Sequence, residues 1–150
     1  MTIAVDFDGT IVEHKYPKIG KPIPFAIDVL KKIQKEERHT LILWTVREGA
    51  LLQEAIDYCK EQGLEFYAHN KNFPGEDFEP GKDGRKVSVD RFIDDRNIGG
   101  LPDWSVIYKI IKSGRNTFDG VDMMEQNYEG QKNWMIRLGE AWGKARGDRY

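Results

Sequence analysis

Two pairs of aspartates lie where short apolar runs end, a placement that suits metal-assisted chemistry. Asp6 and Asp8 belong to the segment TIAVDFDGT at residues 2–10, and Asp94 and Asp95 follow the run RFI. If these runs are neighbouring strands, the four carboxylates meet at one edge, where like charges raise one another's pKa values unless a cation lies between them. Mg²⁺ prefers oxygen ligands and is the cofactor that such a cluster predicts. For Asp6 and Asp8 taken alone, a plain Asp-Gly turn is the alternative.

Phosphoryl transfer is the chemistry that uses such a set of residues. One carboxylate can attack phosphorus and form an aspartyl-phosphate. A second carboxyl group can protonate the leaving alkoxide and later take a proton from water. The transferring oxygens need a metal ion, a lysine and a hydroxyl group to hold them. Thr45, directly after the apolar run LILW, and Lys86, just before the fourth apolar run, are candidates for these contacts.

The apolar pattern predicts the elements that would bring these residues together. Strands are expected at 3–7, 40–45, 64–68 and 87–94, and helices at about 25–35 and 48–62. The segment at 104–111 fits a helix or a strand, and we favour a helix. Strand and helix alternate at a spacing that predicts right-handed crossovers and a mainly parallel, three-layer α/β sheet. In such sheets, ligands bind outside the carboxyl ends of the strands.

These residues resemble the four signature motifs of the haloacid dehalogenase (HAD) superfamily of phosphohydrolases: VDFDGT, the Thr after LILW, a downstream Lys, and FIDD. The stretch FIDDRNIGG and the small size are most similar to its capless phosphatases, and the resemblance spans about residues 2–100. It implies a Rossmann-like HAD fold, with Asp6 as nucleophile and Mg²⁺ ligand. It also implies that Asp8 is the general acid/base and offers its backbone carbonyl to the metal, and that Thr45 binds the phosphoryl group.

One of the paired aspartates would complete the metal site that the resemblance implies. Successive residues at a strand end point in opposite directions, so we expect one direct ligand and one partner behind it. We favour Asp95 over Asp94 as the ligand, although the family uses either position.

Several basic residues compete for the phosphate. Lys86 lies ahead of the fourth predicted strand, where the family usually places its lysine, whereas Lys71 and Lys82 are the alternatives. Arg47 either reaches the phosphate or is a solvated charge near a helix start. His14 follows the first motif and is a candidate contact of the leaving group, the alternative being a surface position.

The chain is expected to form one domain over residues 1–150, with a catalytic core at about 2–112 and a helical extension at about 120–146. Apolar residues of the extension recur at three- and four-residue steps, which predicts an amphipathic helix docked on the sheet. A dimer surface, making the protein a homo-oligomer, or a partial cover over the site are the alternatives. The segments 11–24 and 70–86 are too short for a folded cap domain, so we predict an open site.

The composition argues against nucleic-acid and membrane partners. The net charge is −2 and the pI is about 6.0, which argues against nucleic acid. No apolar run approaches the roughly 20 residues of a membrane span, and the single cysteine, Cys59, fits a helix core. We therefore expect a cytoplasmic protein.

The function predicted from the sequence is a Mg²⁺-dependent phosphomonoester hydrolase that acts through an aspartyl-phosphate. Its phosphorylated substrate is a small molecule, a sugar or a macromolecule, and an open site suits the larger ones. Two alternatives stay open: a phosphotransferase, and a non-catalytic module that binds a phosphorylated ligand on the same scaffold. Retention of Asp8 favours an enzyme, because binding alone requires no general acid.

Overall fold

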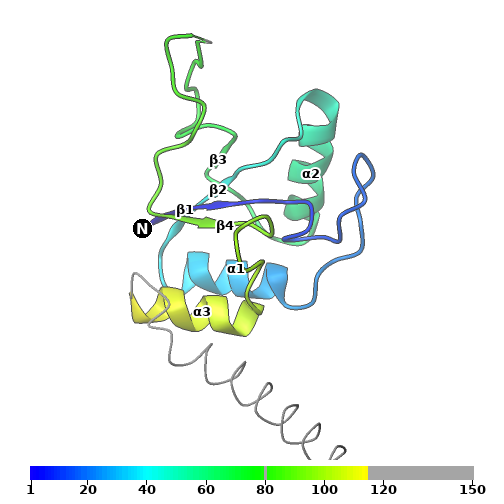
Figure 1. Cartoon of the computed structure of the whole chain (residues 1–150), viewed down its shortest axis with the longest axis vertical. Coiled ribbons are helices and arrows are strands. Elements are labelled where there is room, and N and C mark those ends of the chain that lie inside the picture. Colours follow the sequence, from blue (N-terminus) through cyan, green and yellow to red (C-terminus); the bar gives the residue numbers. More distant parts are fainter. Residues whose placement is uncertain (80, 115–150) are drawn as a thin grey trace, which may run out of the picture. The chain divides into compact units, whose positions relative to one another are not determined.

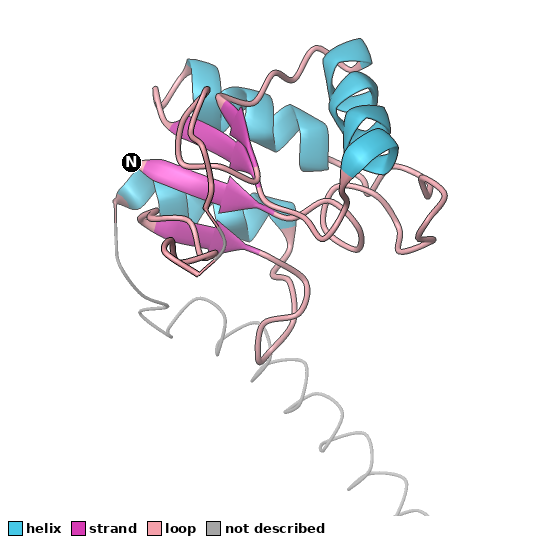
Figure 2. Cartoon of the chain, turned by 90° about the horizontal axis from the view of Figure 1, so that it is seen from above, coloured by secondary structure: helices cyan, strands magenta, loops and turns pink. Residues whose placement is uncertain are grey.

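Four parallel strands form one sheet at the centre of the fold. The computed structural model describes residues 1–79 and 81–114. Its strands are β1 (Thr2–Val5), β2 (Thr40–Leu43), β3 (Ala68–His69) and β4 (Arg91–Ile93), in the order β3-β2-β1-β4. Every pairing between neighbours is parallel, and Figure 2 shows the strands from above. The prediction of an α/β fold with a mainly parallel sheet is confirmed.

Within the described residues, three amphipathic helices connect and follow the strands. They are α1 (Ala26–Lys35), α2 (Gly49–Glu61) and α3 (Trp104–Ser113), so the segment that fitted a helix or a strand is helical. Each helix buries residues at three- and four-residue steps, because that spacing puts them on one face. The buried residues are Ala26, Leu30 and Ile33 of α1, Ala55, Ile56 and Cys59 of α2, and Trp104, Ile107 and Ile111 of α3.

The two faces of the sheet are covered differently. One face packs against the helices, through a core that includes Ile3, Val5, Leu41, Leu43 and Ile93. The alternate residues point to the opposite face. Figure 1 shows α1 and α3 below the sheet and the irregular segment at residues 70–90 above it. The segment between β3 and β4 therefore crosses one face of the sheet.

Strand β3 is shorter than the strand predicted at 64–68 and begins later in the chain. The reason is that Gly63 and Leu64 complete the end of α2. Gly63 has a φ of +75°, and its N–H donates to the Lys60 carbonyl at 2.9 Å. The Leu64 N–H donates to the Cys59 carbonyl at 2.9 Å. These two bonds form a Schellman motif, in which a residue with positive φ terminates a helix. Leu64 is buried as part of that helix end, and not as part of a strand.

Strand β4 is likewise shorter than the expected 87–94. The N–H of Ser88 donates to Asn72 Oδ1 at 2.7 Å, and the N–H of Asp90 donates to the Thr2 carbonyl at 2.9 Å. The start of the predicted strand is thus bonded partly to the side chain of Asn72 and not only to β1. Val87 is buried, which explains why its apolar character resembled a strand.

The chain divides into two units, Met1–Lys112 and Ser113–Tyr150. The sheet belongs to the first. The helical extension predicted at about 120–146 lies outside the described residues. Among the described residues, no helix has both the length and the apolar character needed to cross a membrane.

Candidate functional site

Polar side chains follow all four strands at their carboxyl ends. Because the strands are parallel, these ends share one edge, where α/β folds bind ligands. The polar residues are Asp6 and Asp8 after β1, Thr45 after β2, Asn70 after β3, and Asp94 and Asp95 after β4. A pocket of about 160 Å³ opens there, lined by Asp6, Asp8, His14, Tyr16, Val46, Asp94 and Arg96. It is smaller than the roughly 300–1,000 Å³ of sites that enclose a whole ligand, so a larger ligand would extend into solvent.

Three carboxylates meet beside this pocket. Asp6, Asp94 and Asp95 each offer an oxygen, and these oxygens lie within 4.8 Å of one another. Burial of Asp6 raises its pKa to about 7, and the negative charges of Asp94 and Asp95 act in the same direction. The sequence predicted four aspartates at this edge, with one of Asp94 and Asp95 behind the other. The structure groups three of them, and Asp94 and Asp95 both offer an oxygen.

The cluster has the properties of a cation site. Asp95 Oδ1 is buried, and within the described residues it has no hydrogen-bond partner. A buried polar atom without a partner calls for an explanation, and a cation among three carboxylates is a direct one. All-oxygen donor sets suit hard divalent cations, Mg²⁺ and Ca²⁺ alike. The residues present therefore fit a divalent cation.

Gly9 and Thr10 position this cluster from the turn after β1. Gly9 has a φ of +92°, and a Cβ at this position would lie 2.2 Å from Asp95 Oδ2. The Thr10 hydroxyl donates to Asp6 Oδ2 at 3.2 Å and accepts from the Asp95 N–H at 3.1 Å. This role of Thr10 was not predicted from the sequence. Its signal was the hydroxyl residue directly after Asp-Gly, where a short side chain can turn back onto the strand end.

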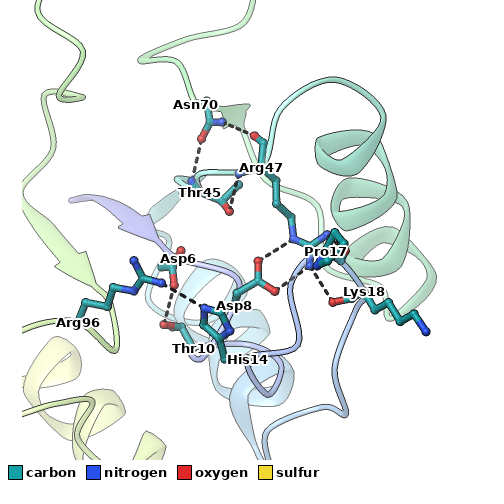
Figure 3. A network of polar contacts seen from close by, with 10 residues as sticks. All are labelled: Asp6, Asp8, Thr10, His14, Pro17, Lys18, Thr45, Arg47, Asn70 and Arg96. Carbon is teal, nitrogen blue, oxygen red and sulfur yellow. Dashed lines mark hydrogen bonds and ion pairs between the residues drawn. The ribbon is translucent and has the colours of Figure 1, made fainter.

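Asp8 is held in a buried ion pair, apart from the three-carboxylate cluster. Arg47 Nε donates to Asp8 Oδ2 and Arg47 Nη2 donates to Asp8 Oδ1, both at 2.7 Å. The guanidinium also donates to the carbonyls of Pro17 at 2.9 Å and Lys18 at 3.0 Å. Figure 3 shows Arg47 reaching from the loop after β2 to Asp8. One arginine thus joins the first motif, the loop before α1 and the end of β2.

Arg47 is not a solvated charge, so this alternative from the sequence is wrong, and its guanidinium is held by Asp8 and by two carbonyls. Its side chain is 0% exposed. Its guanidinium lies 5.1 Å from the ring centre of Phe7 and 5.4 Å from that of Tyr16, a cation–π arrangement. The hydrogen bond with Asp8 raises the pKa of Arg47, so the charge is permanent.

Thr45 is oriented by a residue that the sequence analysis did not single out. Asn70, with a φ of +53°, accepts the Thr45 N–H through Oδ1 at 2.8 Å and donates through Nδ2 to the Arg47 carbonyl at 3.1 Å. The Arg47 N–H donates to Thr45 Oγ1 at 3.3 Å. Because Thr45 Oγ1 acts as acceptor there, its own hydrogen remains available for donation. An Asn two residues after a predicted strand was the available signal, since Asn tolerates the left-handed conformation.

The three candidate lysines lie elsewhere. The exposed Lys86 places Nζ 5.1 Å from the ring centre of Phe92, and Lys82 pairs with Glu79. None of Lys71, Lys82 and Lys86 is among the described residues that line the pocket. The cationic side chain there is Arg96, whose Nη2 lies 3.1 Å from His14 Nε2. His14 does line the pocket, as a leaving-group contact would.

Comparison with known proteins gives one informative similarity. No protein-family model matches the chain, and no curated protein matches it. A solved structure of a conserved protein from Bacteroides thetaiotaomicron is 60% identical in sequence, with a TM-score of 0.71. The match covers 79% of this chain and 93% of that one. At this identity over most of both chains, the protein belongs to the same family as this conserved Bacteroides thetaiotaomicron protein.

Proposed function

We propose that the protein is a Mg²⁺-dependent phosphomonoester hydrolase that acts through an aspartyl-phosphate, as its resemblance to capless HAD phosphatases implies. The observation that carries this proposal is the partly buried cluster of Asp6, Asp94 and Asp95 beside a pocket that Asp8 also lines. Asp6 is a carboxylate beside an open pocket, which a nucleophile needs. The small pocket suits a phosphoryl group whose remaining substrate extends into solvent.

In the first half of the reaction, an Asp6 oxygen would attack phosphorus. A bond forms between this oxygen and phosphorus while the ester P–O bond breaks, and the leaving oxygen takes a proton. In the second half, water attacks the aspartyl-phosphate, loses a proton, and releases inorganic phosphate and free Asp6. Asp6, Asp94 and Asp95 would hold Mg²⁺, which supplies positive charge that keeps Asp6 ionised and offsets the phosphoryl charge. Thr45 supports this scheme, because its hydroxyl keeps a hydrogen to donate.

Asp8 would move the protons. It lines the same pocket as Asp6, and as a carboxylate it accepts two hydrogen bonds from Arg47. This form is ready to accept a proton from water in the second half. To donate a proton in the first half, Asp8 has to weaken at least one of its two contacts with Arg47. Substrates whose leaving oxygen needs no proton should therefore react with less dependence on Asp8.

The test is an assay of hydrolysis of p-nitrophenyl phosphate by the full chain, with Mg²⁺ and with a chelator. Asp6→Asn is compared with Asp57→Asn, a surface aspartate of α2 that lies outside the pocket. We expect Mg²⁺-dependent turnover in the wild type and in Asp57→Asn, and its loss in Asp6→Asn. Acid quenching followed by mass spectrometry of the peptide that contains Asp6 should detect one added phosphoryl group.

The alternatives give other results. A phosphotransferase transfers the phosphoryl group to added alcohol or sugar acceptors. It therefore forms more phosphorylated acceptor than inorganic phosphate. A binding module binds phosphate analogues with wild-type folding and Mg²⁺ binding but shows no turnover. Turnover that Asp6→Asn leaves intact would contradict the proposed nucleophile.

A further inference from the structure

The mouth of the pocket carries a basic pair that the proposed hydrolysis does not use. Arg96 comes from the turn after β4 and His14 from the loop after β1, yet Arg96 Nη2 and His14 Nε2 lie 3.1 Å apart. Figure 3 shows Arg96 reaching past Asp6 toward His14. Both residues are exposed, whereas Asp6 and Asp94 are partly buried. The pocket therefore has carboxylates in its inner part and a basic pair at its solvent side.

The positive charge of Arg96 is not neutralised by the fold. Among the described residues, ion pairs join Arg47 to Asp8, Lys82 to Glu79 and Arg85 to Glu48, and none includes Arg96. Its guanidinium contacts the imidazole of His14, where Arg96 is the donor and Nε2 the acceptor. A surface contact of this kind contributes little to stability. An arginine so placed keeps donors for a ligand, and Arg is well suited to carboxylates and phosphates because its donors form a planar fork.

We propose that Arg96 and His14 form a subsite for a second anionic group, so that the substrate is a phosphomonoester with a carboxylate or a further phosphate close to the ester. This inference rests on the proposed function, because the first anion is the phosphoryl group at Asp6. That group would lie at the carboxylates in the inner part of the pocket, which include Asp6 and Asp94. The exposed pair at the mouth faces the part of the substrate that remains after the phosphoryl group. Exposed Tyr16 and Val46 also line the pocket and give a short carbon skeleton apolar contact.

Two non-hydrolysable ligands test this subsite by equilibrium binding. Propylphosphonate and 3-phosphonopropionate share the phosphonate and differ in a terminal carboxylate. Both are titrated calorimetrically into the full chain with Mg²⁺. We expect the wild type to bind 3-phosphonopropionate about 10-fold more tightly, the lower end for a hydrogen bond between charged groups. Arg96→Gln, which removes the charge from an exposed side chain, should abolish this preference, and His14→Gln should reduce it.

Arg85→Gln is the matched control, because Arg85 is an exposed arginine outside the pocket, and it should keep the preference. Equal affinity of the wild type for both ligands would overturn the proposal. An equal loss for both ligands in Arg96→Gln would also overturn it, by assigning Arg96 to the phosphoryl group itself. Since phosphonates are not hydrolysed, the carboxylate preference is measured whether or not the protein is a phosphatase. A preference that disappears with Arg96→Gln, in a protein without turnover, would refute the proposed hydrolysis and leave the subsite standing.

Discussion

Both carboxylate oxygens of Asp8 accept hydrogen bonds from Arg47, each at 2.7 Å, in a buried pair that spans 39 residues of sequence. The pair joins the turn after β1 to the loop after β2, and Arg47 extends the link to the Pro17 and Lys18 carbonyls. Thus the residue proposed to move protons is also part of the framework that shapes the pocket. Substitutions of this pair should therefore change stability as well as activity.

Loss of Arg47 should destabilise the protein strongly. Arg47→Met leaves the buried Asp8 charge and two loop carbonyls without their donor, and breaking such a pair costs about 3–5 kcal/mol. Urea unfolding followed by circular dichroism measures the change. Arg85→Met, which breaks an exposed pair with Glu48, should cost about 1 kcal/mol or less. Similar losses in the two variants would mean that the buried pair contributes no more than a surface pair.

The effect on kcat of removing the Asp8 carboxylate should depend on the leaving group of the substrate. Asp8→Asn keeps the size of the side chain but cannot supply a proton, and general acid–base catalysis contributes about 10²- to 10⁴-fold. We expect kcat to fall by about 10²-fold or more for an alkyl phosphate, whose leaving oxygen is strongly basic, and by much less for p-nitrophenyl phosphate. Steady-state kinetics with both substrates measures the difference. An identical loss for the two would contradict proton donation by Asp8.

Mg²⁺ affinity should rise with pH up to about neutrality. Burial and the neighbouring carboxylates raise the pKa of Asp6 to about 7, so below this pH a proton competes with the metal. The affinity should increase about tenfold per pH unit below pH 7 and level off above it. Calorimetric titration at several pH values tests this, and Asp6→Asn should flatten the profile. A flat profile in the wild type would show that no proton leaves Asp6 on binding.

The free energy of unfolding of the metal-free protein should fall as the pH rises toward neutrality, whereas the Mg²⁺ affinity rises. The pKa of Asp6 rises from 3.8 to about 7 on folding, so the folded state holds this proton more tightly than the unfolded state. The contribution of this proton to the free energy of unfolding is fully present below about pH 4 and is lost as the pH rises to about 7. Comparing urea unfolding of wild type and Asp6→Asn with chelator across this range isolates the contribution. A difference between them that stays constant with pH would contradict the raised pKa.

A side chain at Gly9 should disrupt the cluster. Gly9→Ala forces a residue with a Cβ into a φ of +92° and brings that Cβ to 2.2 Å from Asp95 Oδ2. Gly99 has a φ of +95° and nothing within 4 Å of the same position, so Gly99→Ala isolates the backbone strain, about 1–2 kcal/mol. Gly9→Ala should cost more than Gly99→Ala and should weaken Mg²⁺ binding, which Gly99→Ala should not. Equal unfolding free energies and equal Mg²⁺ affinities would mean that Asp95 moves aside at no cost.

The sequence by itself determined the class of fold and the acidic part of the site. Apolar periodicity located α1 and α2 and left the segment of α3 open between helix and strand, with a helix favoured. Apolar runs ending in Asp, Thr or Asp-Asp located the ends of β1, β2 and β4. Both signals are local, because three- and four-residue steps put side chains on one helix face and parallel strands end at one edge. Hence the strand ends predicted that aspartates meet at this edge, but not that Asp8 is held apart from Asp6, Asp94 and Asp95.

Tertiary structure decided which partner each of these residues has. Nothing local to Arg47 indicates burial against Asp8, and the position of Asn70 near a strand end does not indicate that its side chain binds Thr45. Lys86 has the expected position in sequence but lies over Phe92, whereas Arg96 reaches the pocket. These contacts join separate loops, whose backbone conformation and side-chain rotamers depend on the packing of the whole fold. Sequence spacing specifies which residues reach the edge of the sheet, and only the packed loops specify which of them touch.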